Sequence, residues 1–441
     1  MKETIIQFGT GNFLRGFVGH FIHTLNEKGL YDGKIVIVQP TKGGKTNIIN
    51  EQGGRYNLFL RGIHNGEEVC EHIEINSVSR GIDPYGDYAS YLALAENPDM
   101  RFIISNTTEA GIVFDESCSF EDRPALSFPG KLTQLLYHRF EMKLGGFAIL
   151  PCELIDSNGD ELKRCVLEYA EKWTLGDDFR NWVENENTFC NTLVDRIVTG
   201  YPKDEADELK KSIGYDDMLL DTAEIFHLWV IGGDFENELP LKKAGINVIW
   251  TNDVAPFKKM KVRILNGAHT SLVFPSLLCG VDSVGESLKD EQLRNYLDIC
   301  LSGYILPVLG ETNENKAFAR AVLERFKNPY IRHLWKSISL NSVSKFTARV
   351  LPTVSDYITE NNTPPKPLVF SLACLIEYYK NNDVHDDEKA VAFIKENGTQ
   401  AILSNTALWG SDLSCFTELV TEGISRIHKD GIREAIKWAV S

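Results

Sequence analysis

The strongest constraint on the fold is a short apolar strand that runs directly into a glycine turn and then into an apolar helix. Residues 4–8 read TIIQF, and Gly9-Thr10-Gly11 follows at once. Large apolar side chains then recur every four residues, at Phe13, Phe17, Phe21 and Leu25. This spacing predicts a helix with one apolar face, ending at Gly29. Strand, tight turn and helix in this order favour a parallel sheet covered by helices.

Later segments divide the chain into two parts. Further apolar runs predict strands at 34–39, 56–60, 72–78, 101–105 and 147–150. From about residue 254 helical patterns dominate, at 261–278 with a kink near Pro275, 286–301, 315–326, 368–379, 387–396 and 417–440 with a break at Gly431. We therefore expect an α/β fold, with a parallel-sheet domain over residues 1–256 and a mostly helical domain over residues 257–441.

Charge and cysteine usage exclude several classes of protein. The chain has 46 basic and 62 acidic residues, a net charge of −16, which disfavours binding to nucleic acid or to an acidic membrane surface. It contains no apolar run of about 18 residues, and its first residues lack the pattern of a signal peptide. Nine scattered cysteines without a Cys-x-x-Cys pair suggest reduced thiols. These features predict a cytoplasmic protein without a metal site.

The glycine turn is suited to a dinucleotide. Gly9 would make the tight turn, and Gly11 would let backbone N–H groups approach a pyrophosphate at the start of the helix. The third glycine of the usual pattern is replaced by Leu14, so a tight turn without a ligand stays open as an alternative. The second strand ends at Gln39 instead of a carboxylate, which leaves NAD and NADP both open as coenzymes.

A second group of polar residues lies in FKKMKVRILNGAH, residues 257–269. Four of the six residues 258–263 are basic, and such a local excess of positive charge favours binding of an anion. On an α-helix, Lys261, Asn266 and His269 fall at roughly 0°, 140° and 80°, within one half of the helix. An amine, an amide and an imidazole on one face are suited to proton transfer at an alcohol carbon. The alternative is a surface lysine, a surface asparagine and a core histidine.

Several stretches together resemble the mannitol dehydrogenase, or polyol-specific long-chain dehydrogenase, family. They are residues 5–17 (IIQFGTGNFLRGF), 105–112 (SNTTEAGI), 127–136, 151–160 (PCELIDSNGD), 191–197 (NTLVDRI) and 261–270 (KVRILNGAHT). K-x-x-x-x-N-x-x-H is the catalytic pattern of this family. The opening, SNTTEAGI and PCELI are most similar to its tagaturonate reductase (altronate oxidoreductase) branch.

The resemblance implies a zinc-independent, nicotinamide-dependent oxidoreductase with a Rossmann-like N-terminal domain. By this resemblance Lys261 is the general acid/base, Asn266 and Asn191 donate to the developing oxyanion, and His269 contacts a substrate hydroxyl. Lys345 and Arg349 are candidates for holding a sugar-acid carboxylate. The residues expected to contact the coenzyme are Gly9, Gly11, Asn12, Phe13, Gln39, Asn106 and Thr107.

The expected reaction is hydride transfer between NAD(H), with NADP open, and a sugar acid, reducing tagaturonate to altronate. Fructuronate reductase and mannitol 2-dehydrogenase are the enzymatic alternatives, and a nucleotide-binding sensor is the non-enzymatic one. The expected partner is a small sugar acid or ketose, and the sequence does not determine the oligomeric state. Lys258 stands where some family members have a proton-relaying glutamate, and the chain is short for the tagaturonate reductase branch.

Overall fold

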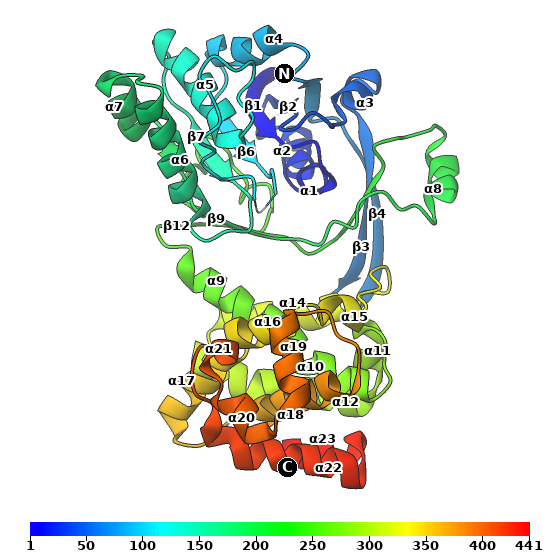
Figure 1. Ribbon diagram of the computed structural model, residues 1–441. Helices are drawn as coiled ribbons and strands as arrows, with labels where there is room; N and C mark the ends of the chain where they lie inside the picture. Colours follow the sequence, from blue (N-terminus) through cyan, green and yellow to red (C-terminus); the bar gives the residue numbers. More distant parts are fainter. Residues whose placement is uncertain (109) are drawn as a thin grey trace. The chain divides into compact units, whose positions relative to one another are not determined.

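The computed structural model describes residues 1–108 and 110–441. These residues form two compact units. Unit 1 contains Met1–Arg61 and Glu68–Ala255, and unit 2 contains Gly62–Glu67 and Pro256–Ser441. The predicted contrast between an α/β part and a helical part is confirmed, because the strands belong to the chain before residue 252 and helices dominate after it (Figure 1).

Unit 1 is built on a six-stranded parallel sheet in the order β5-β2-β1-β6-β7-β8. Its strands are β1 (Lys2–Phe8), β2 (Gly33–Val38), β5 (Val78–Ile82), β6 (Phe102–Ser105), β7 (Ala148–Pro151) and β8 (Thr188–Phe189). The strand order reverses between β1 and β6, where Phe8 pairs with Ser105. Ligands of open parallel sheets bind at such a reversal, beyond the carboxyl ends of the strands.

One predicted strand is wrong. Residues 72–78 are the end of β4 (Glu67–Ile75) and the start of β5, which lie in different sheets. Two three-stranded sheets complete unit 1, in the orders β10-β3-β4 and β12-β11-β9, except that the turn between β3 and β4, Gly62–Glu67, is assigned to unit 2. Their remaining strands are β3 (Tyr56–His64), β9 (Thr192–Asp195), β10 (Asp221–Glu224), β11 (Leu228–Gly232) and β12 (Val248–Thr251).

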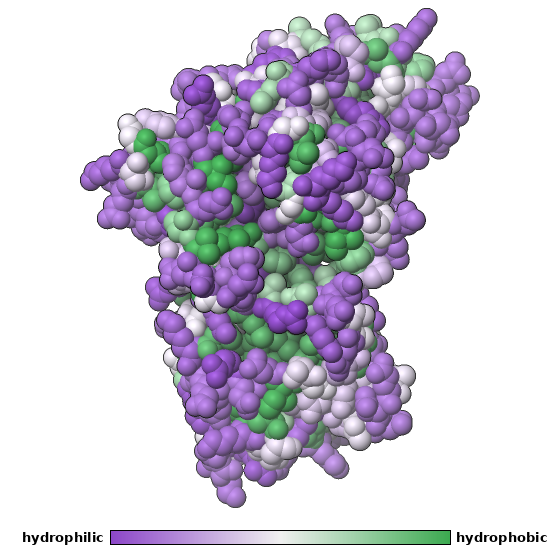
Figure 2. Space-filling view, turned by 180° about the vertical axis from the view of Figure 1, so that it is seen from behind, coloured by the Kyte–Doolittle hydropathy of each residue, from purple (hydrophilic) through white to green (hydrophobic). Residues whose placement is uncertain are grey.

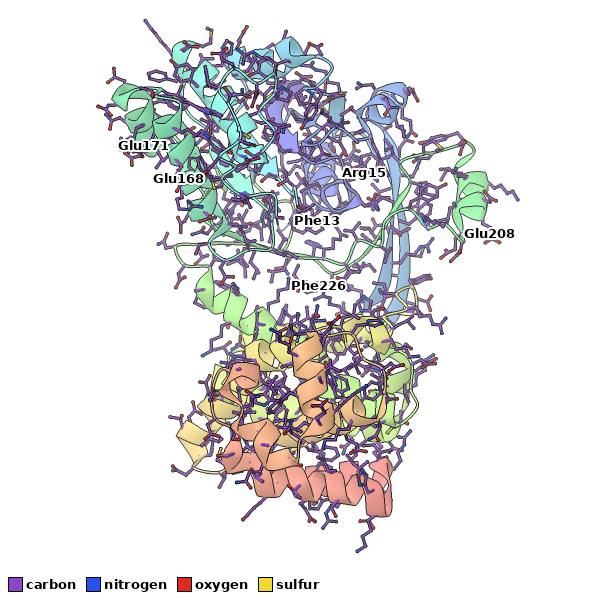
Figure 3. The ribbon with its side chains drawn as sticks, in the orientation of Figure 1. Phe13, Arg15, Glu168, Glu171, Glu208 and Phe226 are labelled. Atoms are coloured by element: carbon purple, nitrogen blue, oxygen red, sulfur yellow. The ribbon has the colours of Figure 1, made fainter. Side chains whose placement is uncertain are left out.

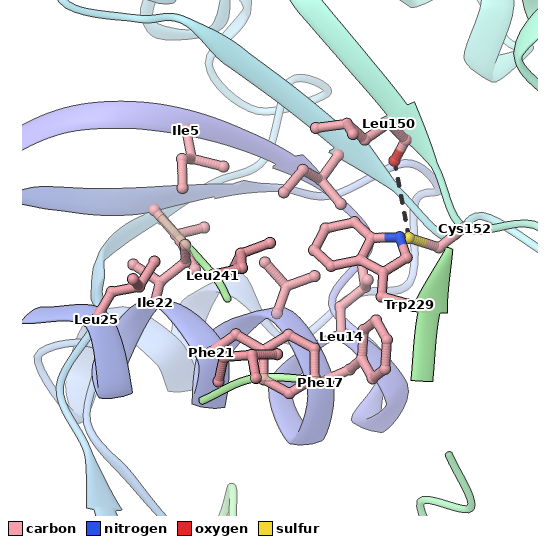
Figure 4. Packing of buried hydrophobic residues seen from close by; sticks show 14 of the residues in the cluster. Ile5, Leu14, Phe17, Phe21, Ile22, Leu25, Leu150, Cys152, Trp229 and Leu241 are labelled. Atoms are coloured by element: carbon pink, nitrogen blue, oxygen red, sulfur yellow. Dashed lines mark hydrogen bonds between the residues drawn. The ribbon is translucent and has the colours of Figure 1, made fainter. Parts of the chain in front are cut away.

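The main sheet has an apolar core on each face, because successive side chains of a strand point to opposite faces. On one face Ile5 packs with Phe17 and Trp229 (Figure 4). On the other, Ile6 packs with Leu132. The helices of unit 1 are α1 (Asn12–Leu14), η1 (Arg15–Gly19), α2 (His20–Glu27), α3 (Thr46–Glu51), α4 (Tyr88–Ala93), η2 (Leu94–Glu96), α5 (Phe128–Glu141), α6 (Asn158–Lys172), α7 (Asp177–Glu186) and α8 (Ala206–Ile213).

Unit 2 is helical. Its elements are α9 (Ala255–Lys261, with Ala255 in unit 1), η3 (Val262–Asn266), α10 (Gly267–Leu278), α11 (Val284–Lys289), α12 (Glu291–Cys300), η4 (Leu301–Ile305), α13 (Leu306–Leu309), α14 (Asn313–Phe326), α15 (Trp335–Ile338), α16 (Ser342–Arg349), α17 (Leu351–Asn361), α18 (Lys366–Asn381), α19 (Glu388–Glu396), α20 (Thr399–Ser404), α21 (Thr406–Trp409), η5 (Ser414–Phe416), α22 (Thr417–Asp430) and α23 (Ile432–Val440). Helix α18 is almost wholly buried and packs against α10 and α22.

Two sequence-based helices of unit 2 can be compared directly. The break at Gly431 is confirmed, because α22 ends just before it and α23 begins just after it. The single helix predicted over 286–301 is wrong: it is interrupted at Asp290, whose carboxylate accepts from the N–H groups of Gln292 and Leu293 and so starts α12. An aspartate that caps a new helix stabilises the break.

The molecular surface is mainly polar on the face shown in Figure 2, where apolar side chains form separate patches. Among residues 1–108 and 110–441, no helix combines the length and apolar character needed to cross a bilayer. All nine cysteines are free thiols.

His227 in unit 1 is held in its neutral form. Its Nδ1 lies 3.1 Å from the Ile225 carbonyl oxygen, and its Nε2 accepts from the Asn247 N–H at 3.1 Å. A proton on Nε2 would therefore face another donor. Burial and then the charge of Arg196 lower the pKa of His227 to about 4.

We expect this histidine to make the fold acid-sensitive. Because its pKa is lowered on folding from 6.5 to about 4, its contribution is complete above about pH 6.5 and is lost as the pH falls toward 4. The loss amounts to at most about 3 kcal/mol. Thermal unfolding from pH 8 to pH 4 should show a shallower decline for His227→Gln than for wild type or for a control at the exposed His64, His64→Gln. Parallel curves for all three proteins would contradict the assignment.

Candidate active site

The glycine turn lies at the reversal of strand order in unit 1. Gly9 has φ +132°, and a Cβ there would lie 2.8 Å from the Asn106 carbonyl oxygen, so the position favours glycine both by conformation and by space. The Asn106 N–H donates to the Phe8 carbonyl at 3.0 Å, which ties the end of β6 to the end of β1. The structure therefore brings Gly9 and Asn106, two predicted coenzyme residues, together.

The space beyond the turn is open. A Cβ on Gly11 would meet no atom within 4 Å. Gly11 caps α1 without a side-chain acceptor for the first helical N–H groups, and the helical elements continue to Glu27. Uncapped N–H groups at a helix start attract an anion. This turn thus fits the pyrophosphate of a dinucleotide.

Arg15 holds the glycine turn in place through its side chain. The sequence did not predict a role for this residue. Its guanidinium donates to the Thr10 carbonyl at 2.7 Å and to Asn12 Oδ1 at 2.6 Å. The side chain is only 1% exposed, and Asp221 lies 3.9 Å away. Burial raises the pKa of Asp221 to about 7, although the charge of Arg15 opposes this. Figure 3 shows Arg15 and Phe13 on the same helical stretch after β1.

Phe13 and Gln39, both predicted to contact the coenzyme, are engaged in packing. Phe13 stacks on Phe17 with ring centroids 5.0 Å apart. Gln39 is only 3% exposed, and its Oε1 accepts from the Thr46 hydroxyl at 3.0 Å. The side-chain oxygen of Gln39 is therefore committed within the protein, and the end of β2 presents no carboxylate from this position.

The loop after β6 is held by a buried carboxylate that sequence reasoning missed. Glu153 accepts from the Thr107 N–H and hydroxyl, both at 2.9 Å, and from the Ser105 hydroxyl at 2.9 Å. Desolvation raises the pKa of Glu153, and these hydrogen bonds oppose the shift. Asn106 Nδ2 donates to the Cys152 carbonyl at 2.8 Å. Asn106 and Thr107 are thus positioned by the two residues that follow β7, and the PCELI stretch was the only signal for Glu153.

In unit 2, Lys261 and Asn266 are related by a π-helical segment. The prediction assumed a regular α-helix, but η3 (Val262–Asn266) is a π-helix between α9 and α10. The hydrogen bonds of a π-helix link residue i to i+5 instead of i+4, so one turn holds more residues than in an α-helix, and residues five apart are offset by a smaller angle. Lys261 and Asn266 are five apart, and the angle of 140° expected for an α-helix is wrong. The two side chains lie more nearly on one face than predicted.

The π segment is anchored to α17. Arg263 donates to Thr353 Oγ1 at 2.7 Å and to Asp356 Oδ2 at 3.0 Å, with the guanidinium nearly buried. On the next turn Gly267 approaches α16, where a Cβ would lie 3.3 Å from the Arg349 carbonyl oxygen. These contacts hold the irregular helix in place, and π segments often occur at functional sites.

His269 lies in an aromatic setting in α10. Its ring stacks on Phe326 at 4.2 Å and meets His333 edge-on at 6.0 Å. Burial, followed by the charges of His333 and other cations, lowers the pKa of His269 well below its usual value. Its Nε2 is screened from solvent and has no hydrogen-bond partner in residues 1–108 and 110–441. A neutral imidazole thus keeps one buried nitrogen unpaired.

Asn191, the fourth predicted catalytic residue, belongs to unit 1. Its Oδ1 accepts from the N–H groups of Gly159 and Asp160 at 2.9 and 3.0 Å, and its Nδ2 donates to the Asp160 carboxylate at 2.8 Å. The amide is thus fixed at the start of α6. One of its two N–H bonds is used by Asp160, and the other can serve a ligand.

Lys345 and Arg349 lie one turn apart on α16, so they share a face. Lys345 Nζ donates to the Ile338 carbonyl at 2.9 Å. Desolvation lowers the pKa of both side chains. Desolvation also lowers the pKa of Lys258, which stands at the position of the family's glutamate. Within the described part of the chain, no three His, Cys, Asp or Glu side chains are grouped so as to hold a metal ion.

Comparison with known proteins identifies the family of this chain. The family model of the mannitol dehydrogenase Rossmann domain matches residues 3–243, and that of the mannitol dehydrogenase C-terminal domain matches residues 253–428. An altronate oxidoreductase of Bacillus subtilis strain 168 is 43% identical over 455 residues, covering 99% of this chain and 95% of the relative. One from Cronobacter sakazakii is 42% identical over 464 residues, covering 98% of this chain and 96% of the relative.

Two solved structures share the fold. A substrate-free D-sorbitol dehydrogenase superposes with a TM-score of 0.87 at 23% identity, over 99% of this chain and 95% of that one. Mannitol 2-dehydrogenase of Pseudomonas fluorescens, in a ternary complex with NAD and D-mannitol, has a TM-score of 0.73 at 19% identity, over 99% and 94%. With two family models matching most of its length, the chain belongs to the mannitol dehydrogenase family, and it is an oxidoreductase that acts on CH–OH groups.

Proposed function

We propose that this protein is an NAD-dependent oxidoreductase that interconverts tagaturonate and altronate. The observation that carries the proposal is the similarity to altronate oxidoreductases over 98–99% of the chain, at 42–43% identity. The paired cations Lys345 and Arg349 on one face of α16 agree with an anionic substrate. A neutral ketose such as fructose would not need them.

The glycine turn would hold the coenzyme. The open space at Gly11 and the uncapped N–H groups of the helix would receive the pyrophosphate, with Arg15 keeping the turn in shape. When bound, the nicotinamide supplies or accepts the hydride at the carbinol carbon. We propose NAD as the coenzyme because the mannitol 2-dehydrogenase that shares this fold was solved with NAD. Gln39 leaves NADP as the alternative, since no carboxylate at this position would reject its additional phosphate.

Side chains of the protein would transfer the proton and stabilise the negative charge on the reacting oxygen. Lys261 as an ammonium gives its proton to the ketone oxygen during reduction, and as a neutral amine it takes the hydroxyl proton during oxidation. Asn266 and Asn191 donate N–H groups to the oxygen while its negative charge develops. Asn191 is oriented for this role because its other amide contacts fix it at α6. From the family pattern, we propose that His269 contacts a substrate hydroxyl.

A coupled absorbance assay tests the function. We expect NADH to be consumed with tagaturonate at a kcat/KM at least about ten-fold above that with fructuronate or fructose, and NADPH to be the poorer coenzyme; a ten-fold ratio corresponds to about 1.4 kcal/mol of differential transition-state binding. A preference for fructuronate or fructose would support a fructuronate reductase or a mannitol 2-dehydrogenase instead. A change in NADH fluorescence on mixing, with no consumption on any substrate, would indicate a sensor.

A further inference from the structure

An arginine and an aspartate are buried together next to the glycine turn of unit 1. Arg15 is 1% exposed, and Asp221 in β10 is 0% exposed. Arg15 Nη2 lies 3.9 Å from Asp221 Oδ2, which is too far for a hydrogen bond. Asp221 Oδ2 and Arg15 Nε both lack a hydrogen-bond partner among the residues that the structure describes. The two side chains therefore interact through their charges alone.

Other contacts hold Arg15 and the turn in position. The guanidinium donates to the Thr10 carbonyl at 2.7 Å and to Asn12 Oδ1 at 2.6 Å. It also lies 5.8 Å from the centroid of the Tyr56 ring, and the Tyr56 hydroxyl donates to the Arg15 carbonyl at 2.8 Å. Because none of these contacts involves Asp221, loss of its charge would leave the turn in place. Asp221 therefore acts on the turn through its charge and not by holding it.

We propose that Asp221 is the resident counter-ion of Arg15 and sets the affinity for the coenzyme, because its ionised form opposes binding of the pyrophosphate at the glycine turn. The proposal rests on the proposed function, in which this turn holds the pyrophosphate, and deepens it. With Asp221 ionised, the buried pair carries no net charge. With Asp221 neutral, Arg15 keeps an uncompensated positive charge beside the turn, which attracts an anion. Asp221 acts through Arg15 and needs no contact with the coenzyme.

Protonation of Asp221 is accessible near neutral pH. Burial raises the pKa of Asp221 to about 7, while the charges of Arg15, Lys45 and Arg196 oppose this rise. Tyr56 on the neighbouring strand β3 stays neutral, because burial raises its pKa. A bound anion disfavours the ionised carboxylate further, so coenzyme binding takes up a proton. The affinity for the coenzyme should therefore increase as the pH falls toward about 7 and level off below that pH.

Calorimetry on the wild-type protein tests this without any substitution. NADH is titrated at a pH just above 7 in two buffers that differ in ionisation enthalpy, and the difference in heat gives the number of protons taken up. We expect uptake of part of one proton, and a Kd roughly 3–10-fold lower at pH 6.5 than at pH 8.5, as expected for charges about 10 Å apart in a protein. ADP-ribose has the pyrophosphate but no nicotinamide, so the same behaviour with ADP-ribose would exclude titration of Lys261 as the cause.

Two matched variants assign the proton to a residue. Asp221→Asn keeps the shape of the side chain and removes its charge, so its Kd for NADH at pH 8.5 should equal that of wild type at pH 6.5, without proton uptake. Asp217→Asn, the control, makes the same change at another aspartate of 0% exposure, whose carboxylate accepts from Gln52 and Asn57. It should keep the pH dependence of wild type. Thermal melts check that both variants are folded.

A purely structural role of Asp221 gives the opposite result. Weaker binding of NADH by Asp221→Asn at every pH would show that the carboxylate supports the turn, and would overturn the proposal. Proton uptake that persists in Asp221→Asn, or that disappears in Asp217→Asn, would assign the proton to another group. A wild-type Kd that does not change with pH would overturn the proposal even if Asp221→Asn does not fold. These outcomes leave the proposed function intact, whereas failure of the wild type to bind NADH or ADP-ribose at any pH would refute its coenzyme site.

Discussion

Replacing Lys261 with alanine should lower kcat by roughly 10²–10⁴-fold, the range for loss of a positioned general acid or base. Lys261 is the last residue of α9 and precedes the π segment that carries Asn266. Its removal takes away both the proton and the positive charge at the developing oxyanion. The coenzyme contacts proposed at the glycine turn do not involve this side chain, so NADH affinity, measured by fluorescence titration, should stay within about two-fold of wild type.

A matched control comes from the same helix. Lys259 is more than half exposed and lies 3.7 Å from Asp356, so it forms a surface ion pair of small energetic value. Lys259→Ala should keep nearly full activity. Wild-type turnover in Lys261→Ala, or an equal loss in Lys259→Ala, would show that the general acid/base lies elsewhere.

Replacing Gly9 with valine should abolish coenzyme binding and destabilise unit 1. A side chain at φ +132° is strained by about 1–3 kcal/mol, and the contact with the Asn106 carbonyl adds to this cost. The turn would have to move away from the end of β6, and its N–H groups would move with it. Titration with NADH and a thermal melt measure the two effects separately.

Gly11 provides the control that separates binding from folding. Its φ of −71° suits any residue, and a Cβ there meets no atom within 4 Å. Gly11→Ala should therefore melt like wild type while its affinity for NADH falls at least about ten-fold, about 1.4 kcal/mol, because the methyl group occupies the space of the pyrophosphate. Unchanged NADH affinity in Gly11→Ala would place the dinucleotide elsewhere.

The parallel sheet was predictable because its strands are buried on both faces and read as apolar runs such as residues 34–39 and 101–105. Strand 72–78 was predicted wrongly because Asn76 and Ser77 are a short connection between two strands that both continue the apolar pattern. Strands β9 to β12 were missed. They are no shorter than β6 and β7, which were predicted, but they belong to the two smaller sheets and not to the main parallel sheet. Periodicity alone does not assign apolar runs of four or five residues to a strand or a helix.

The candidate site was predicted less completely than the fold. Family motifs pointed to Lys261, Asn266 and His269, but no residue pattern predicted the π segment. A segment of five residues is too short for its apolar spacing to distinguish a π-helix from an α-helix. Arg15 and Glu153 were also missed. Each is a single polar residue whose importance depends on a partner distant in the sequence, Asp221 for Arg15 and Thr107 for Glu153, so only the folded chain reveals it.

The irregular helix 255–278 has a consequence for protein engineering. Lys261 and Asn266 are five residues apart across the π-helical segment, and Asn266 and His269 are three residues apart across the start of α10. The motif therefore spans two kinds of helix. Grafting K-x-x-x-x-N-x-x-H onto an ideal designed helix would leave the amine and the amide about 140° apart around the helix axis. A scaffold designed for this chemistry needs the wider π-helical turn between the lysine and the asparagine as much as it needs the three side chains.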